Sequence, residues 1–313
     1  RTADRPLAMV GVEELGKVFI GTVPTAGKLG GLLIYARPTD ASPGIVKEAE
    51  YKPVPNHSIL SLVYKNGMLI GGTSIRGGEG AYATDIDAND KSGKLFIWDV
   101  AKKTKVFETV VVNGYGAVPS LIEGPDGNIW GIAGDTLFIF DPVQRKIVYN
   151  ERKFPGVSHT SWTNGFLELG TDGHLYGTIG KGSVAEHENT FASSFFKIDT
   201  STREVTVLLH TGAERLAQDD FGDFYFKTGG NLFRYHDPNL AVKLSGAEIT
   251  VDHDSIPIGM TATMKVKGIL EKGRTTYELS GASKEYVTSD PSVVSIADGV
   301  ITAKKKGKAD VWV

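Results

Sequence analysis

The chain has 313 residues, no cysteine and a formal net charge of −3. These values exclude disulfides and cysteine-based metal or redox chemistry, and they give no attraction to nucleic acid or an anionic membrane. The sequence contains no apolar run long enough to predict a membrane span. Its 38 glycines and scarce helix signals are typical of many short strands joined by turns.

A ribbon of two short apolar strands recurs five times along the chain. In the copy at 124–141, an Asp126-Gly127 turn leads into a first strand, and a tight turn at Gly134-Asp135 leads into the aromatic-rich strand Thr136–Asp141. The other copies begin near residues 15, 66, 172 and 221. This spacing of roughly 45–60 residues is typical of propeller blades. Unrelated hairpins in a β-sandwich are the alternative.

The sequence therefore predicts an all-β fold with a β-propeller of four-stranded blades, five of them in this chain. Whether five blades complete the ring or belong to a larger one stays open. The fifth blade is expected to start at Arg215 and to end with a fourth strand at Ala241–Leu244. Trp98, Trp130 and Phe138 fall inside strand patterns and are expected in the core between blades. The predicted first strands of the first four blades are Leu7–Val12, Ser58–Val63, Val118–Glu123 and Trp162–Leu169.

The pattern changes after Leu244, which divides the chain into a predicted propeller at 1–245 and a second domain at 246–313. Alternating apolar residues with turn signals predict a small Ig-like β-sandwich there. The Ser-Asp-Pro-Ser-Val run at 289–293, followed by Gly-Val-Ile-Thr-Ala-Lys at 299–304, resembles the ending of the bacterial immunoglobulin-like group 2 (BIG2) family. That resemblance implies a secreted or cell-surface bacterial protein in which this domain is a spacer.

The first domain broadly resembles extracellular bacterial propellers, among them the streptogramin-lyase-like and polysaccharide-lyase propellers. The resemblance implies an extracellular polysaccharide or a cell-wall polymer as the partner. Arg1 is not a natural start, so we expect this chain to be a piece of a longer or processed protein.

Blade topology predicts where a site lies. In an up-and-down blade, the connection into strand one and the turn between strands two and three lie at the same end, and long loops at one end of a rigid scaffold often bind ligands. The residues expected at the blade entries are Arg5, His57, Tyr115, His159 and Arg215. The long insertions at 73–93 and 181–193 carry Arg76, Tyr82, Glu186 and His187.

This set of side chains suits β-elimination on a uronate polysaccharide. An arginine neutralises the uronate carboxylate, and a histidine or tyrosine takes the C5 proton while another protonates the leaving oxygen. The alternative for each residue is an ordinary hydrogen bond to a neighbouring strand. The predicted catalytic residues are His57, Tyr115, His159, Arg215 and Arg76. The predicted substrate-binding residues are Trp162, Tyr82, His187 and Arg5.

The insertion at 73–93 also carries oxygen ligands at alternate positions, Asp85, Asp87 and Asn89, a pattern that suits calcium. The glutamate that ends an EF-type loop is replaced by Phe96, and a solvated acidic loop is the alternative. No cofactor is required, and calcium is the one candidate. The sequence thus predicts a propeller that binds an extracellular polysaccharide, with cleavage left open. The alternative is a non-catalytic scaffold that binds carbohydrate or protein at the cell surface.

Overall fold

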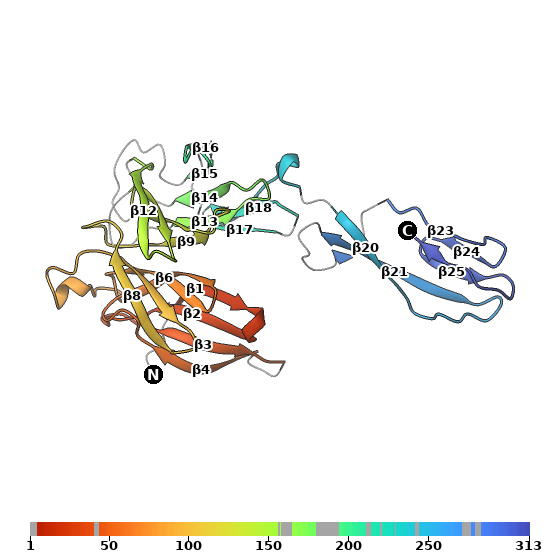
Figure 1. Ribbon diagram of the computed structural model, residues 1–313, viewed down its shortest axis with the longest axis horizontal. Helices are drawn as coiled ribbons and strands as arrows, with labels where there is room; N and C mark the ends of the chain where they lie inside the picture. Colours follow the sequence, from red (N-terminus) through yellow and green to blue (C-terminus); the bar gives the residue numbers. More distant parts are fainter. Residues whose placement is uncertain are drawn as a thin grey trace. The chain divides into compact units, whose positions relative to one another are not determined.

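The computed structural model describes residues 5–40, 44–155, 157, 165–179, 194–210, 214–219, 221–228, 230–241, 244–270, 277–278 and 283–313. The fold of these residues is all-β (Figure 1). Their helices are single 3-10 turns, none of the length and apolarity that a membrane crossing requires. The chain divides into two compact units, one of residues 1–219 and 223–236 and one of residues 220–222 and 237–313.

The first unit begins with four antiparallel sheets, each of four strands in chain order. Sheet one contains β1 (Arg5–Val12), β2 (Lys17–Val23), β3 (Leu33–Pro38) and β4 (Ile45–Tyr51). Sheet two contains β5 (Ser58–Lys65), β6 (Met68–Ser74), β7 (Lys94–Asp99) and β8 (Thr104–Val110). Sheet three contains β9 (Ser120–Glu123), β10 (Ile129–Ala133), β11 (Thr136–Asp141) and β12 (Lys146–Arg152). Sheet four contains β13 (Gly165–Leu169), β14 (Leu175–Ile179), β15 (Ser194–Ile198) and β16 (Val205–Leu209).

Sheet five differs from the prediction. Its described strands are three: β17 (Glu214–Gln218), β18 (Phe224–Thr228) and β19 (Asn231–Tyr235). The fourth strand predicted at Ala241–Leu244 is wrong, because Leu244 begins β20 (Leu244–Val251), which pairs with β21 (Thr261–Leu270) in the second unit. Leu244 belongs to the first strand of the next domain.

One packing unit is repeated in sheets two, three and four. A glycine on the second strand lies opposite a phenylalanine on the third, in the pairs Gly71–Phe96, Gly131–Phe138 and Gly177–Phe196. A Cβ atom at these glycines would lie 2.3–2.5 Å from the phenylalanine ring. The ring therefore occupies the space that any other residue would fill, which explains the glycine inside a strand.

The turn before the second strand is also repeated. In sheet three, Asp126 Oδ1 accepts hydrogen bonds from the Asn128 backbone and from Trp130 Nε1, at 3.1 and 2.9 Å. In sheet four, Asp172 accepts from the His174 backbone and from the Tyr176 hydroxyl. The aspartate of each Asp-Gly turn thus orients an aromatic ring of the following strand.

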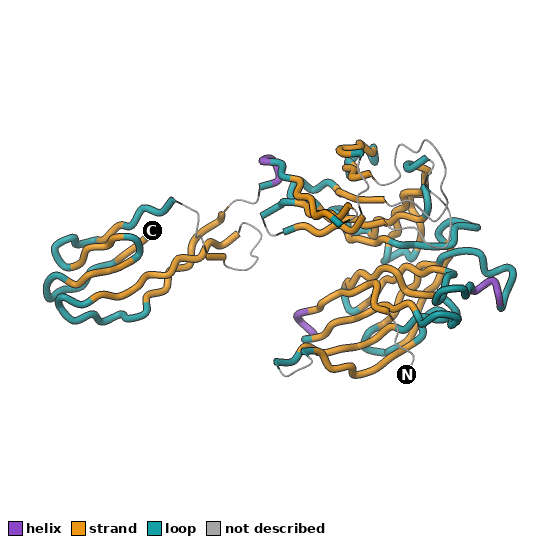
Figure 2. The backbone as a smooth tube through the Cα atoms, turned by 180° about the vertical axis from the view of Figure 1, so that it is seen from behind, coloured by secondary structure: helices purple, strands orange, loops and turns teal. Residues whose placement is uncertain are grey.

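The sheets pack in sequence through their first strands. Contacts join β1 to β5, β5 to β9, β9 to β13 and β13 to β17, while no comparable contact joins β17 to β1 within the described residues. Apolar clusters fill the spaces between successive sheets, one of them around Phe19 and Leu69 and another around Ile70 and Phe138. Trp98, Trp130 and Phe138 are buried, as predicted. Figure 2 traces these strands and the loops that connect them.

In the second unit, β20 and β21 continue through β25 (Val300–Ala303) to β24 (Val294–Ala297), and β22 (Tyr277–Glu278) pairs with β21. A separate pair joins β23 (Val287–Thr288) to β26 (Val311–Trp312). Met264, Val266 and Ile301 form the buried core. The sequence-based domain boundary at 245/246 lies inside β20, while the compact units divide after residue 236.

Candidate functional site

The connections into the first strands and the loops between second and third strands meet at one end of the first unit, which we call the loop-rich end. The β6–β7 loop joins the connection into sheet three, because Gly93 N donates to Tyr115 O at 2.7 Å and Ile75 N donates to Gly116 O at 3.0 Å. It also joins the β2–β3 loop, because Gly78 N donates to Lys28 O at 2.8 Å. These hydrogen bonds bring together the loops of sheets one, two and three at this end, while the predicted insertion at 181–193 lies outside the described residues.

The β6–β7 insertion is an ordered element. It forms a bridge between Arg76 and Tyr82, and it includes the 3-10 helix η2 (Ala83–Asp85). A Cβ atom at Gly78 would lie 1.7 Å from the Thr25 carbonyl oxygen, so a glycine is required for this close approach to the β2–β3 loop. The insertion holds the Tyr82 side chain at the surface, with 36% of the residue exposed.

His57 lies in the interior and is unsuited to the predicted catalytic role. Its exposed fraction is 0%, with Nδ1 at 2.9 Å from Thr73 Oγ1 and Nε2 at 3.0 Å from Asp90 Oδ2. Thr73 Oγ1 also accepts a hydrogen bond from Lys94 N, so its own proton is directed to Nδ1 of His57. This arrangement favours a neutral imidazole that donates through Nε2 to Asp90. His57 thus connects the start of sheet two to the β6–β7 insertion, and both of its ring nitrogens form hydrogen bonds.

We expect the burial of His57 to make stability depend on pH. Burial lowers the pKa of His57 below its ordinary value of 6.5, despite the opposing effect of Asp90. Below pH 6.5 the unfolded chain therefore takes up a proton that the folded chain does not, so the free energy of unfolding falls, by at most about 1.4 kcal/mol per pH unit for this group. Urea unfolding between pH 7.5 and 5 measures this slope. His57→Gln should reduce it, and an equal slope in that variant would contradict the assignment.

Tyr115 belongs to a hydrogen-bonded cluster at the loop-rich end. Its hydroxyl donates to Asp135 Oδ1 at 3.0 Å, and Asp135 is fully buried. Arg152 donates to Asp135 Oδ2 through Nε at 2.7 Å and Nη2 at 2.6 Å. Burial and the neighbouring carboxylate both raise the pKa of Tyr115, so it is a poor proton acceptor at neutral pH. The sequence did not identify Asp135 or Arg152 as site residues, although the Gly134-Asp135 turn was recognised.

The remaining predicted residues are dispersed or lie outside the described chain. Arg5 is exposed at the start of β1, opposite Val23. Arg215 is exposed, has a φ of 60° and places its guanidinium 5.4 Å from the Phe166 ring centre. The predicted residues that lie outside the described residues are His159, Trp162, Glu186 and His187.

Two of the three predicted calcium ligands accept hydrogen bonds from the backbone of their own loop. Asp85 Oδ2 accepts a hydrogen bond from Tyr82 N at 2.7 Å, and Asp87 Oδ1 accepts from Asn89 N at 2.9 Å. Asp90 is directed to His57 and Lys94. In the described part of the chain, no three His, Asp or Glu side chains come together as a metal site. Two of the three predicted ligands, Asp85 and Asp87, thus accept backbone hydrogen bonds within their own loop, and calcium binding stays a prediction.

No family model and no curated protein matches the sequence. Among solved structures, the chain is similar to an extracellular domain of a hybrid two-component system from B. thetaiotaomicron, with 13% identity over 90% of this chain and 37% of that chain and a TM-score of 0.46. A second such domain from that organism has 12% identity over 90% and 47% of the two chains, with a TM-score of 0.41. A protein of unknown function from Bacteroides caccae has 9% identity over 88% and 82%, with a TM-score of 0.46. The chain thus spans less than half the length of either B. thetaiotaomicron domain.

Proposed function

We propose that this chain is a secreted or cell-surface bacterial β-propeller segment that binds an acidic extracellular polysaccharide at its loop-rich end without cleaving it. The second unit is proposed to be a BIG2-like spacer. The ordered β6–β7 insertion is the observation that carries this proposal. It links sheets one, two and three at the loop-rich end and exposes Tyr82 on a preformed surface beside the half-buried Arg76, which lowers the entropic cost of binding a flexible polymer.

The chemistry of this end supports a polyanionic partner with sugar rings. Arg152 is held in one orientation by the buried Asp135, while 68% of its side chain stays exposed. Lys28 and Lys91 are also exposed on the loops of this end. An exposed tyrosine face packs against the C–H surface of a pyranose, and guanidinium groups pair with carboxylates.

Binding is favoured over β-elimination because two of the predicted proton-transfer groups are committed elsewhere. His57 is buried with both nitrogens hydrogen-bonded, and Tyr115 donates its proton to Asp135. A general base must reach the substrate proton directly or through one water molecule. Neither side chain meets that requirement.

We expect Tyr82→Ala to weaken binding to polygalacturonate, alginate or hyaluronate by roughly tenfold, since stacking and apolar contact of one aromatic ring contribute on the order of 1–2 kcal/mol. Affinity electrophoresis on these polymers measures the effect, with a neutral glucan as the reference polymer. Trp312→Ala removes a 47% exposed aromatic residue in the second unit and serves as the matched control.

Equal retardation of the Tyr82→Ala variant and the unmodified chain would contradict this site. Unsaturated product absorbance during incubation with the polymers would instead support the lyase alternative. Retention on every polymer including the neutral glucan would reject the acidic class.

A further inference from the structure

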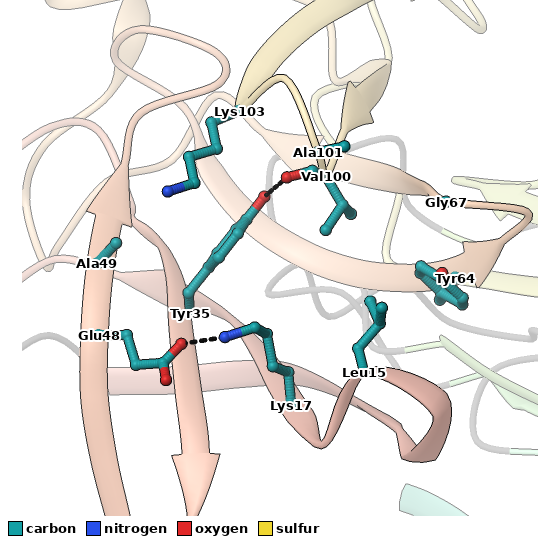
Figure 3. Close-up of a pocket in the computed structure, with 10 residues that line it drawn as sticks. All are labelled: Leu15, Lys17, Tyr35, Glu48, Ala49, Tyr64, Gly67, Val100, Ala101 and Lys103. Atoms are coloured by element: carbon teal, nitrogen blue, oxygen red, sulfur yellow. Dashed lines mark hydrogen bonds and ion pairs between the residues drawn. The ribbon is translucent and has the colours of Figure 1, made fainter.

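A pocket of ≈ 380 Å³ lies between sheets one and two, away from the loop-rich end (Figure 3). Its walls come from β2, β3, β4 and β5 and from the turns between strands one and two and between strands three and four. These turns lie at the opposite end of an up-and-down sheet. The residues that line it are Leu15, Lys17, Tyr35, Glu48, Ala49, Tyr64, Gly67, Val100, Ala101 and Lys103. Its volume falls within the range of small-molecule sites.

The floor of the pocket is rigid and aromatic. Tyr35 is 4% exposed, and its hydroxyl accepts a hydrogen bond from Trp98 Nε1 at 2.7 Å and donates to Val100 O at 3.3 Å. Phe19 packs edge-to-face on Tyr35 at 4.8 Å and stacks with Tyr64 at 6.3 Å. A ring-shaped ligand thus meets side chains whose orientation is already fixed.

The charged residues that line the pocket are Lys17, Lys103 and Glu48, so one cation is in excess among them. Glu48 pairs with Lys17 and with Arg37, whose Nε lies 3.6 Å from Glu48 Oε1. Lys103 is exposed at the rim, and its side chain extends into the space beside Tyr35 in Figure 3. It makes no hydrogen bond or ion pair with the described residues, although the hydrogen bond from Lys17 and, more weakly, the charge of Lys103 lower the pKa of Glu48. An ammonium at the mouth of a pocket attracts an anionic group.

The turn between strands three and four that carries Lys103 in sheet two recurs in sheets three and four. The residues at the same position there show which contacts fill the space between neighbouring sheets. Arg145 and Arg203 occupy the same position in sheets three and four, four residues after an aspartate and at a positive φ. Arg145 donates to Val106 O at 3.3 Å, and Arg203 lies over the Tyr149 ring at 4.6 Å, so both contact the fourth strand of the preceding sheet. The pocket beside Arg145 measures only ≈ 190 Å³.

We propose that the pocket between sheets one and two binds a small carboxylate-bearing sugar ring of hexuronic-acid type, with the carboxylate on Lys103 and the ring against the tyrosines. Between sheets two and three, Arg145 contacts the preceding sheet and the pocket is smaller. Between sheets one and two, Lys103 makes no such contact and leaves room for the ligand. Glu48 lines the same pocket, and its carboxylate supplies an acceptor for a sugar hydroxyl. This site is separate from the surface proposed above for the polymer.

The test is titration of the full chain with D-galacturonate, followed by calorimetry and by the Trp98 indole N–H resonance. That resonance reports on the pocket because Trp98 donates to Tyr35. We expect saturable binding of galacturonate, with galactose and inorganic phosphate each at least roughly tenfold weaker. Lys103→Glu should abolish galacturonate binding. Lys103→Arg should weaken it although the charge is kept, because the larger guanidinium group fills part of the pocket. Tyr82→Ala changes the loop-rich end alone and should leave the galacturonate-induced shift of the Trp98 resonance unchanged.

Lys306→Glu makes the same charge change on an exposed residue of the second unit and is the matched control. An equal loss in Lys306→Glu and Lys103→Glu would overturn the proposal, since it would indicate a general charge effect. Galactose binding as tightly as galacturonate would overturn the role of the carboxylate, and phosphate binding as tightly would overturn the role of the sugar ring. An unshifted Trp98 resonance at saturating galacturonate would overturn the site.

Discussion

Phe138→Ala is expected to lower the free energy of unfolding by about 3–5 kcal/mol, the usual cost of truncating a fully buried phenylalanine. Phe138 has an exposed fraction of 0% and packs between sheets two and three against Leu121 and Phe140. For a unit of this size, the change corresponds to a fall in melting temperature of roughly 6–20 °C. Thermal and urea unfolding measure it. Phe233→Ala, on a 42% exposed residue of β19, is the matched control and should cost much less.

The glycine opposite Phe138 allows a sharper version of this test. A Cβ atom at Gly131 would lie 2.4 Å from Phe138 Cζ and 2.8 Å from Leu121 Cδ2, so Gly131→Ala should cost about 1–3 kcal/mol through overpacking. Adding Phe138→Leu shortens the opposing side chain and should recover part of that loss. Strictly additive costs in the double variant would show that the glycine is not there to accommodate the ring.

Asp135→Ala is expected to lower the free energy of unfolding by about 2–3 kcal/mol, since it removes a buried carboxylate that accepts charge-assisted hydrogen bonds. Asp135 receives Tyr115 and Thr136 on one oxygen and Arg152 on the other. The loss should stay below that of a fully buried ion pair, because the guanidinium that remains is exposed and hydrated. Chemical denaturation of the purified variant measures the change.

Asp141→Ala provides the control for this cluster. Asp141 ends the same strand, and within the described residues its carboxylate accepts the Val143 and Gln144 backbone donors in an exposed turn. It should cost no more than about 1 kcal/mol. Similar losses in the two variants would mean that the cluster around Asp135 adds nothing beyond a local turn. Asp135→Asn, which keeps the shape and removes the charge, should lie between them.

The sheets were predictable from the sequence because their signals are local. The Asp-Gly turns, the apolar alternation and the aromatic third strands each act within a few residues, and the four-stranded order of sheets one to four follows from them. The fourth strand of sheet five was misplaced because Ala241–Leu244 is apolar without indicating a pairing partner. A strand pattern does not identify the sheet that the strand joins.

The side-chain environments of the candidate site were less predictable, since each depends on partners far along the chain. His57 was correctly placed at a sheet entry, but its burial depends on Thr73 and Asp90, 16 and 33 residues away. Asp135 and Arg152 were missed because neither belongs to a known motif, and their pairing arises only when β11 and β12 align. Lys103 has no motif of its own, and what distinguishes it from Arg145 and Arg203 is the missing contact with the preceding sheet.

The first strands pack in succession, so the sheets of the first unit form a linear series of pairwise interfaces. Each sheet is stabilised by contacts with its immediate neighbours. A destabilising substitution in one sheet therefore affects only the interfaces with the adjoining sheets. Duplicating or deleting a whole repeat changes the interface at that point. The interfaces between the remaining neighbouring sheets stay the same. Such an arrangement lets evolution alter the number of repeats without redesigning the core, and it lets each gap between sheets diverge separately, as the lysine in one gap and the arginines in the next two illustrate.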